Sequence, residues 1–362
     1  MRRESFVLKI FVRPEIFIYA AFLVFTTAFF VLSSLVQNSG PASLQGGQDI
    51  LKHYVNLNAA RIIWTAILFV LALFVHGFVL WCKAVIQHID PITLLTRQNV
   101  VRFIRGARSV LKNSVFFGIP FALTFYSMSM ALGPLNVFNA TRLRDELLFT
   151  WDTFLTGTFP PLSLASFQYP GWFVNAVDFS FFYLVPVLTI FGAYLLIARP
   201  RLFREAAGAF FLGLMILFFG WFAFPVLSPH DRFIDNVYEL PTVEAIQPYL
   251  EEYRPQQEIA SFLEGMRESK EGLSVLPTST FPSAHVAWAV VLVYYAWRLW
   301  PWLGLAIFPF ALLSAIGTFF FAQHYFVDFP AGVLVSMASI FVAQWFVKQQ
   351  EKFNRPAVVS QI

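Results

Sequence analysis

Long runs of apolar residues, separated by shorter polar or charged segments, dominate the chain. Each run is close to the ~20 residues that an α-helix needs to cross the hydrocarbon core of a bilayer. The pattern predicts eight membrane-spanning helices, near residues 14–36, 61–82, 115–134, 174–197, 206–226, 283–299, 302–322 and 328–347. We therefore expect an all-α, polytopic integral membrane protein, with the lipid bilayer as its surroundings.

The composition supports this interpretation. Of the 362 residues, 58% are hydrophobic and 13% are charged, whereas a soluble domain carries about a quarter charged residues. The first apolar run follows a basic segment, but it is longer than the ~7–15-residue core of a signal peptide, so we interpret it as the first span. Cys82 is the single cysteine of the chain, which excludes an intrachain disulfide.

Lysine and arginine are unevenly distributed between the two predicted sides of the membrane. With the N-terminus in the cytoplasm, 17 of the 25 Lys and Arg residues lie in cytoplasmic segments and 8 lie on the other side. Cytoplasmic loops of membrane proteins carry an excess of these residues. The distribution therefore predicts that both termini are cytoplasmic.

Three connecting segments differ from ordinary short loops. On the predicted exterior side, residues 135–173 and 227–282 are long, and the second segment is rich in Pro, Glu and Arg, which favours a functional cap or an ordered extramembrane segment. On the cytoplasmic side, residues 83–113 are either an amphipathic helix on the inner leaflet or an ordinary basic loop.

Candidate chemistry gathers at the predicted exterior ends of the last three spans. Ser283 and His285 begin the sixth span, and His324 and Asp328 lie where the seventh gives way to the eighth. A hairpin of two spans brings both histidines to the same membrane face. His324 and Asp328 are four residues apart, so they share a face if the chain is helical there.

These residue types suit the transfer of a phosphoryl group. A carboxylate that accepts a hydrogen bond from one imidazole nitrogen fixes the tautomer and makes the other nitrogen a better nucleophile. A second histidine can protonate a leaving oxygen. The helix start at Ser283 offers a hydroxyl, backbone N–H groups and the positive end of a helix dipole, which together bind phosphate readily.

Two short motifs resemble those of a known superfamily. The segments "FPSAH" and "HYFVD" resemble the second and third motifs of the type 2 phosphatidic acid phosphatase and haloperoxidase superfamily, and "DELLFTWDTFLTGTFP" and "FPVLSPHDRF" are similar to segments of its inositol phosphorylceramide synthase branch. The resemblance implies a six-helix phosphatase-like core over residues 115–347. Residues 1–114 would then hold two N-terminal spans and the basic segment, and residues 348–362 a cytoplasmic tail.

The resemblance also implies roles for individual residues. His324 would be the nucleophile that forms a phosphohistidine, Asp328 would orient it, and His285 would serve as acid and base. Ser283 would cradle the phosphoryl oxygens. Ala284 replaces the usual glycine of the second motif, and Gly317 and Thr318 stand where the third motif has Ser-Arg.

Without that arginine, another basic residue has to stabilise the phosphate. Arg232 is the best placed substitute, and Lys270 is a further candidate for substrate binding. The site would lie on the exterior face, which is periplasmic or lumenal.

Three functions remain open at this stage. The first is an inositol phosphorylceramide synthase-like phosphotransferase, which moves a phosphoryl or headgroup-phosphoryl unit from a membrane lipid phosphoester donor to a lipid alcohol. The second is a lipid phosphate phosphatase, acting on phosphatidic acid or a polyprenyl phosphate with water as acceptor. The third is a non-enzymatic transporter or structural membrane protein, disfavoured because no matching broken spans occur in two halves of the chain. We expect no cofactor, no metal and no nucleic-acid partner.

Overall fold

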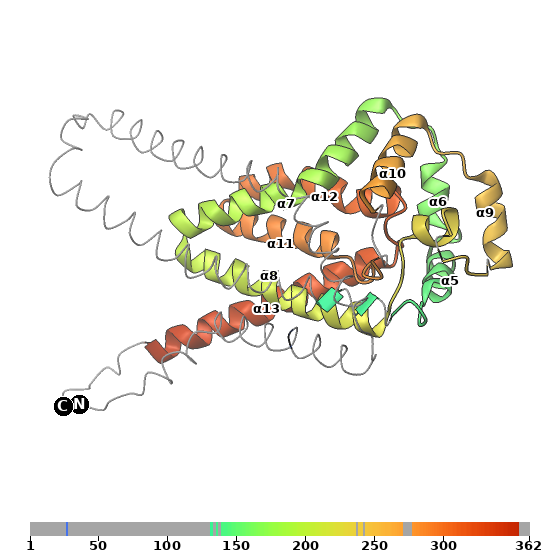
Figure 1. Ribbon diagram of the computed structural model, residues 1–362. Helices are drawn as coiled ribbons and strands as arrows, with labels where there is room; N and C mark the ends of the chain where they lie inside the picture. The colour runs from blue at the N-terminus through green and yellow to red at the C-terminus, as the bar shows by residue number, and fades with distance from the viewer. Residues whose placement is uncertain are drawn as a thin grey trace, which may run out of the picture.

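The computed structural model describes residues 139–354, apart from 237, 242 and 271–276, together with residues 27, 131, 132, 135 and 136. Five long helices run side by side, and several short helices gather at one end of them (Figure 1). The long helices are α7 (Gly171–Ala198), α8 (Pro200–Ala223), α11 (Ala284–Leu299), α12 (Pro301–Phe320) and α13 (Asp328–Asn354). The predicted all-α class is confirmed for the described residues.

The long helices agree with the last five predicted spans. Four segments are long and apolar enough to cross a membrane: Gly171–Leu196, Pro200–Ala223, Pro301–Phe320 and Asp328–Glu351. Helix α11 is also apolar but has 16 residues. The predicted spans at 14–36 and 61–82, most of the span at 115–134, and the basic segment 83–113 lie outside the described residues. The chain is a multi-pass integral membrane protein.

Helix α11 lies at the centre and contacts α7, α8, α12 and α13. Two glycines allow α8 and α13 to approach the turn that precedes α11. A Cβ on Gly332 of α13 would lie 2.7 Å from the Ser283 carbonyl oxygen, and one on Gly220 of α8 would lie 2.4 Å from Pro282 Cδ. Larger side chains at these two positions would push both helices away, so the glycines fix the Pro282–Ser283 turn between α8 and α13.

The two long predicted loops form short helices. Residues 135–173 include α5 (Asp145–Thr156) and α6 (Pro160–Ala165). Residues 227–282 include a π-helical turn η2 (His230–Ile234), a 3₁₀ turn η3 (Glu244–Ile246), α9 (Gln247–Glu252) and α10 (Gln257–Lys270). They lie together at the right-hand end of the bundle in Figure 1. The second segment is therefore largely ordered, as expected.

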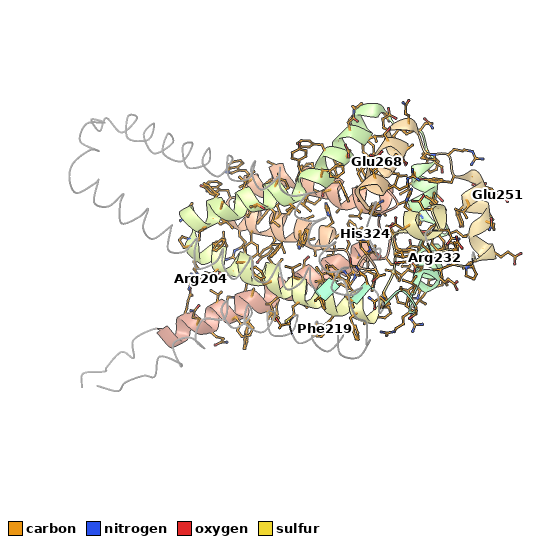
Figure 2. All side chains as sticks on the ribbon, in the orientation of Figure 1. Arg204, Phe219, Arg232, Glu251, Glu268 and His324 are labelled. Carbon is orange, nitrogen blue, oxygen red and sulfur yellow. The ribbon has the colours of Figure 1, made fainter. Side chains whose placement is uncertain are left out.

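The opposite end of the bundle is held by ion pairs. Glu205, which is buried in α8, lies 3.2 Å from Arg298 Nη1 and 3.8 Å from Arg201 Nε. Arg201 also lies 2.8 Å from Glu351 of α13. In Figure 2, Arg204 is labelled near this end of the bundle and His324 toward the other end. This end therefore gathers basic side chains from α8 and α11.

Candidate active site

A histidine and an aspartate form a close pair between α12 and α13. His324 Nδ1 lies 2.8 Å from Asp328 Oδ2, and the same oxygen accepts the backbone N–H of Tyr325 at 3.1 Å. The two residues do not share a helix, contrary to one premise of the sequence argument. The chain leaves α12 after Phe320 and turns with Ala322 at a φ of 50°, and Asp328, the first residue of α13, then reaches back to His324.

Ser283 completes the contact between the two sequence motifs. It is the N-cap of α11, and its hydroxyl oxygen accepts the backbone N–H of Val286 at 3.4 Å. The same oxygen lies 3.5 Å from His324 Nε2, at the outer limit of a hydrogen bond. Because the first N–H groups of an α-helix have no partner within the helix, the start of α11 presents donors beside the His324 ring.

The surroundings of His324 favour its neutral form. Burial lowers the pKa of the imidazole from 6.5 to about 4, against a smaller opposing effect of a hydrogen bond with the Thr280 backbone. About 14% of the side chain stays exposed. We assign the Nδ1 proton to the bond with Asp328, which leaves the lone pair on Nε2, the atom that faces Ser283.

His285 lies next to Ser283 in the chain but contacts a different helix. Its ring stacks on Phe181 of α7, with 4.3 Å between the ring centroids, and its Nε2 lies 2.8 Å from the Phe181 carbonyl oxygen. A carbonyl can only accept, so Nε2 carries a proton in this contact. In the neutral ring Nδ1 is then the nitrogen that can accept and return a proton.

Two carboxylates that the sequence analysis did not identify hold the loop around His324. Asp152 of α5 accepts the backbone N–H groups of Phe326 at 2.8 Å and of Val327 at 2.9 Å. Asp145, two turns earlier, accepts the Tyr325 hydroxyl at 2.8 Å and the Leu227 backbone N–H at 3.0 Å. Helix α5 therefore fixes the three residues that follow His324.

Both carboxyl groups are unusually weak acids. Burial raises the pKa of Asp145 to about 7, opposed by the Tyr325 hydroxyl, the Leu227 N–H and the charge of Arg232. Burial likewise raises the pKa of Asp152 to about 7, opposed by its two backbone hydrogen bonds. A signal for this pair was present in the sequence, because two aspartates seven residues apart lie on one face of a helix.

The two candidate basic residues make their contacts away from Ser283 and His324. Arg232, in η2, donates to the Pro241 carbonyl at 2.8 Å and lies 3.9 Å from Glu146. Lys270, at the end of α10, donates to both carboxylate oxygens of Asp231 at 2.7 and 2.9 Å. Among the described residues, no hydrogen bond or ion pair joins either one to Ser283 or His324.

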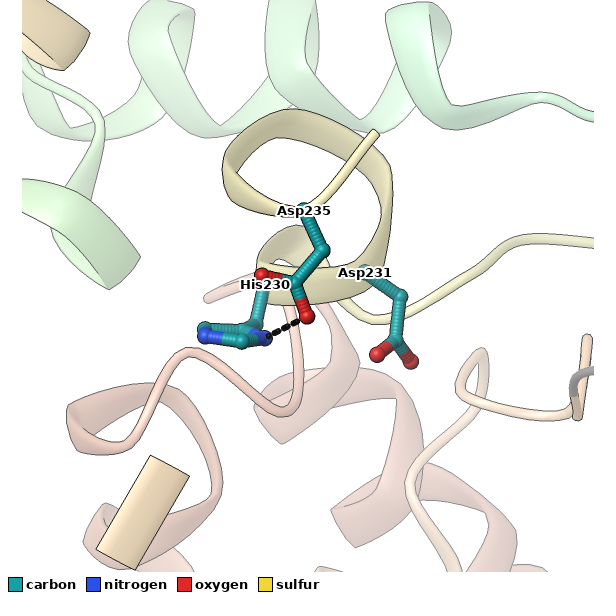
Figure 3. A group of neighbouring side chains, drawn as sticks. All are labelled: His230, Asp231 and Asp235. Atoms are coloured by element: carbon teal, nitrogen blue, oxygen red, sulfur yellow. Dashed lines mark ion pairs between the residues drawn. The ribbon is translucent and has the colours of Figure 1, made fainter. Parts of the chain in front are cut away.

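A second cluster of titratable groups lies on η2 and at its end (Figure 3). His230, Asp231 and Asp235 each offer an atom that could bind a metal ion, all within 4.8 Å of one another, and Asp235 lies 3.3 Å from His230 Nδ1. The sequence analysis had not recognised these residues as a cluster. Lys270 occupies both oxygens of Asp231, so an ammonium group already neutralises one of the three candidate ligands.

A cavity of about 540 Å³ opens beside the loop that carries His324 rather than over it. Its wall includes Arg144, Asp145, Glu146, Thr150, Arg232 and Pro241. His324 and Ser283 do not line it, and the bond from Asp145 to Tyr325 lies between the cavity and His324. Leu143, Leu147 and Leu240 also line it, so Arg232 faces a recess of mixed polar and apolar character next to the loop.

A comparison with known protein families identifies the superfamily of the chain. The sequence model of the PAP2 superfamily matches residues 146–342, more than half of the chain. The protein belongs to the PAP2 superfamily. It is therefore an enzyme of the lipid phosphatase and phosphotransferase type, and its substrates are lipid phosphoesters. Searches of curated proteins and of solved structures gave no match.

The PAP2 match includes all the candidate residues. Ser283, His285, His324 and Asp328 lie inside it, and so do Arg232 and Lys270. The structure brings Ser283, His324 and Asp328 together, leaves His285 on the Phe181 carbonyl, and sets the two basic residues around η2. Of the α5 carboxylates, Asp152 lies inside the PAP2 match, and Asp145 directly precedes it.

Proposed function

We propose that this PAP2 enzyme is an inositol phosphorylceramide synthase-like phosphotransferase, which moves a headgroup phosphate from one membrane lipid to the hydroxyl of another. The observation that carries the proposal is the position of His324, with Nδ1 on Asp328 and Nε2 facing Ser283 at the start of α11. An oriented, neutral imidazole beside a helix N-terminus suits nucleophilic attack on a phosphoester.

The proposed reaction has two steps. Nε2 of His324 attacks phosphorus, the bond to the departing lipid alkoxide breaks, and His285, which enters this step protonated on both nitrogens, gives that oxygen its Nδ1 proton. The acceptor hydroxyl then attacks the phosphohistidine, His285 takes the hydroxyl proton, and the bond between phosphorus and Nε2 breaks. Asp328 keeps the Nδ1 proton in place throughout, and Ser283 with the first turn of α11 binds the phosphoryl oxygens.

Arg232 and Lys270 are proposed to contribute positive charge near the substrate rather than a direct contact in the resting structure. Arg232 lines the cavity beside the loop that carries His324, where a lipid headgroup would bring negative charge. Lys270 is held by Asp231, so its charge is largely compensated. Of the two, Arg232 is therefore the stronger candidate for substrate binding.

Transfer is favoured over hydrolysis by the enclosure of the nucleophile. His324 keeps about 14% of its side chain exposed, and α5 covers the loop that follows it. Water is partly excluded from such a site, so a lipid hydroxyl that binds in place has the advantage. We therefore expect ping-pong kinetics.

A reconstituted assay separates the two outcomes. Purified protein in vesicles receives phosphatidylinositol as donor, with or without ceramide or diacylglycerol, and the products are identified by mass spectrometry. The proposal requires turnover that depends on the acceptor and yields a new phospholipid, with His324→Ala as the inactive control. Fast hydrolysis of phosphatidic acid without any acceptor lipid would instead identify a phosphatase.

The proposed orientation has both termini in the cytoplasm and the active site on the exterior face. The basic residues that surround Glu205, at the end opposite His324, support it. A cysteine in place of the exposed Glu251 of α9 should react with a membrane-impermeant thiol reagent in intact cells, in a Cys82→Ser background. Protection of that cysteine until the cells are lysed would reverse the orientation.

A further inference from the structure

Helix α5 presents three different faces along its 12 residues. One face is buried and carries Asp145, Leu148, Phe149 and Asp152. At 100° per residue, the exposed surface divides into two flanks on either side of that face. With 12 residues, α5 is too short to cross a bilayer and is not one of the membrane-spanning helices.

One exposed flank is entirely apolar. It consists of Leu147, Trp151, Phe154 and Leu155, and Phe154 and Leu155 are 85% and 59% exposed. The other flank is polar, and its exposed Glu146 and Thr150 line the cavity that also contains Arg232. A helix with an apolar flank next to a polar one has the geometry of helices that lie in a membrane surface.

The apolar flank continues onto the membrane-spanning part of the molecule. The ring of Trp151 lies 6.3 Å from that of Phe224, the residue that ends α8, and 6.4 Å from that of Phe281, just before α11. The last turns of α8 expose Phe219 and Phe222. Aromatic side chains therefore link the end of α8 to the apolar flank of α5.

The same edge shows the composition of a membrane–water interface. The guanidinium group of Arg142, three residues before α5, lies 5.6 Å above the ring of Phe222. Aromatic rings concentrate at the level of the headgroups, and basic side chains near helix ends reach the same level. These contacts place the start of α5 at the depth where the lipid phosphates lie.

We propose that α5 lies in the surface of the bilayer, with the flank Leu147–Trp151–Phe154–Leu155 among the lipid acyl chains and the flank of Glu146 and Thr150 toward water. The buried face of the same helix binds the backbone of the loop that carries His324. Helix α5 thus connects the bilayer surface directly to the proposed nucleophile and holds it at the depth of the lipid phosphodiester. This location does not depend on which lipid acts as donor or acceptor.

Fluorescence quenching in vesicles tests the location. Full-length protein with Cys82→Ser receives a single cysteine at Phe154 or, as a control on the polar flank of the same helix, at the exposed Glu146. Each cysteine is labelled with an environment-sensitive fluorophore and the protein is reconstituted in phosphatidylcholine vesicles. We expect phospholipids with nitroxide-labelled acyl chains to quench the label at 154 several-fold more strongly than the label at 146, and aqueous iodide to show the reverse order.

Two results would overturn the proposal. Equal quenching by iodide at both positions would place the apolar flank in water. Protection of the label at 154 from both quenchers would show that another part of the chain, or a second copy, covers this flank. A cysteine at Leu155, on the same flank, must repeat the result obtained at 154, which guards against a local effect of one substitution.

Discussion

The described residues contain two His–Asp pairs with different surroundings. His324 and Asp328 join α12 to α13 at 2.8 Å, and His230 and Asp235 close the η2 turn at 3.3 Å. In both pairs Nδ1 faces the carboxylate, and burial lowers the pKa of both imidazoles. A histidine beside an aspartate is therefore not by itself enough to identify a nucleophile.

The groups around each pair make the difference. His324 Nε2 faces the hydroxyl of Ser283 at a helix N-terminus, and Asp328 also accepts a backbone N–H. The neighbour of His230 is Asp231, whose charge Lys270 already balances. The first pair has a place for a phosphoryl group, whereas the second is part of a compensated charge network that ties η2 to α10. The comparison favours a structural role for the second pair.

Removing the imidazole should give the largest difference in activity between the two pairs. His324→Ala should lower kcat by about four orders of magnitude or more, since losing a covalent nucleophile removes the reaction path. His230→Ala should lower kcat by less than about tenfold and should mainly reduce thermal stability. Initial rates and melting curves of both variants in detergent measure the difference. Equal losses of activity at matched stability would mean that both pairs take part in the chemistry.

Replacing the aspartates should give a smaller difference in the same direction. Asp328→Asn keeps the shape of the side chain but no longer stabilises the correct tautomer, so kcat should fall by about 10² to 10⁴-fold. Asp235→Asn should change kcat by about twofold at most, because no reacting group depends on it. The comparison requires KM values as well, since an unchanged KM for both variants shows that the loss lies in the chemical step. A large effect of Asp235→Asn on kcat would contradict the assignment.

Weakening the support that α5 gives to the first pair should lower the rate less than replacing Asp328 and should also change the stability. Asp152→Asn weakens the hold on Phe326 and Val327, so kcat should fall by about tenfold with KM little changed. Thr153→Ser, on the same helix, is the control, because its hydroxyl donates only to carbonyls of α5. Equal falls in kcat in both variants would point to general disturbance of α5.

The pH dependence of the free energy of unfolding tests whether Asp152 is protonated in the folded chain. Its pKa in the folded chain, about 7, lies above the ordinary value of 3.8, so the folded state keeps a proton that the unfolded chain releases. The contribution of this group to the free energy of unfolding is complete below about pH 4 and is lost as pH rises to about 7. Asp152→Asn should therefore flatten the decline over this interval. An unchanged slope would show that Asp152 is ionised in the fold.

Much of the architecture could be predicted because the membrane imposes it. Apolar runs of the length of a bilayer have to be helices there. The five predicted spans inside the described residues are all helical, and four of them are long enough to cross a membrane. The meeting of Ser283 with His324 also followed from the sequence, because a hairpin of two spans returns the chain to the same face. These predictions depend on length and periodicity alone.

Other features of the site depend on side-chain direction, which a pattern of residues does not specify. The sequence placed His285 near His324, but the first turn of α11 directs its Nε2 to the Phe181 carbonyl. Lys270 was a candidate phosphate ligand, and it instead pairs with Asp231, 39 residues earlier. Asp145 and Asp152 were missed because their partners lie 82 or more residues away in the sequence, which no local motif contains.

The central claim is that the headgroup phosphate passes through a covalent bond to His324, and mapping the adduct tests it most directly. Purified enzyme is mixed with a labelled phospholipid donor without an acceptor lipid, stopped in alkaline denaturant to preserve phosphohistidine, and digested for mass spectrometry. We predict that the peptide containing His324 carries the label, that an acceptor lipid removes it, and that His230 stays unmodified. Label on His230 or another residue, or turnover with no labelled peptide under conditions where a phosphohistidine standard survives, would contradict the account.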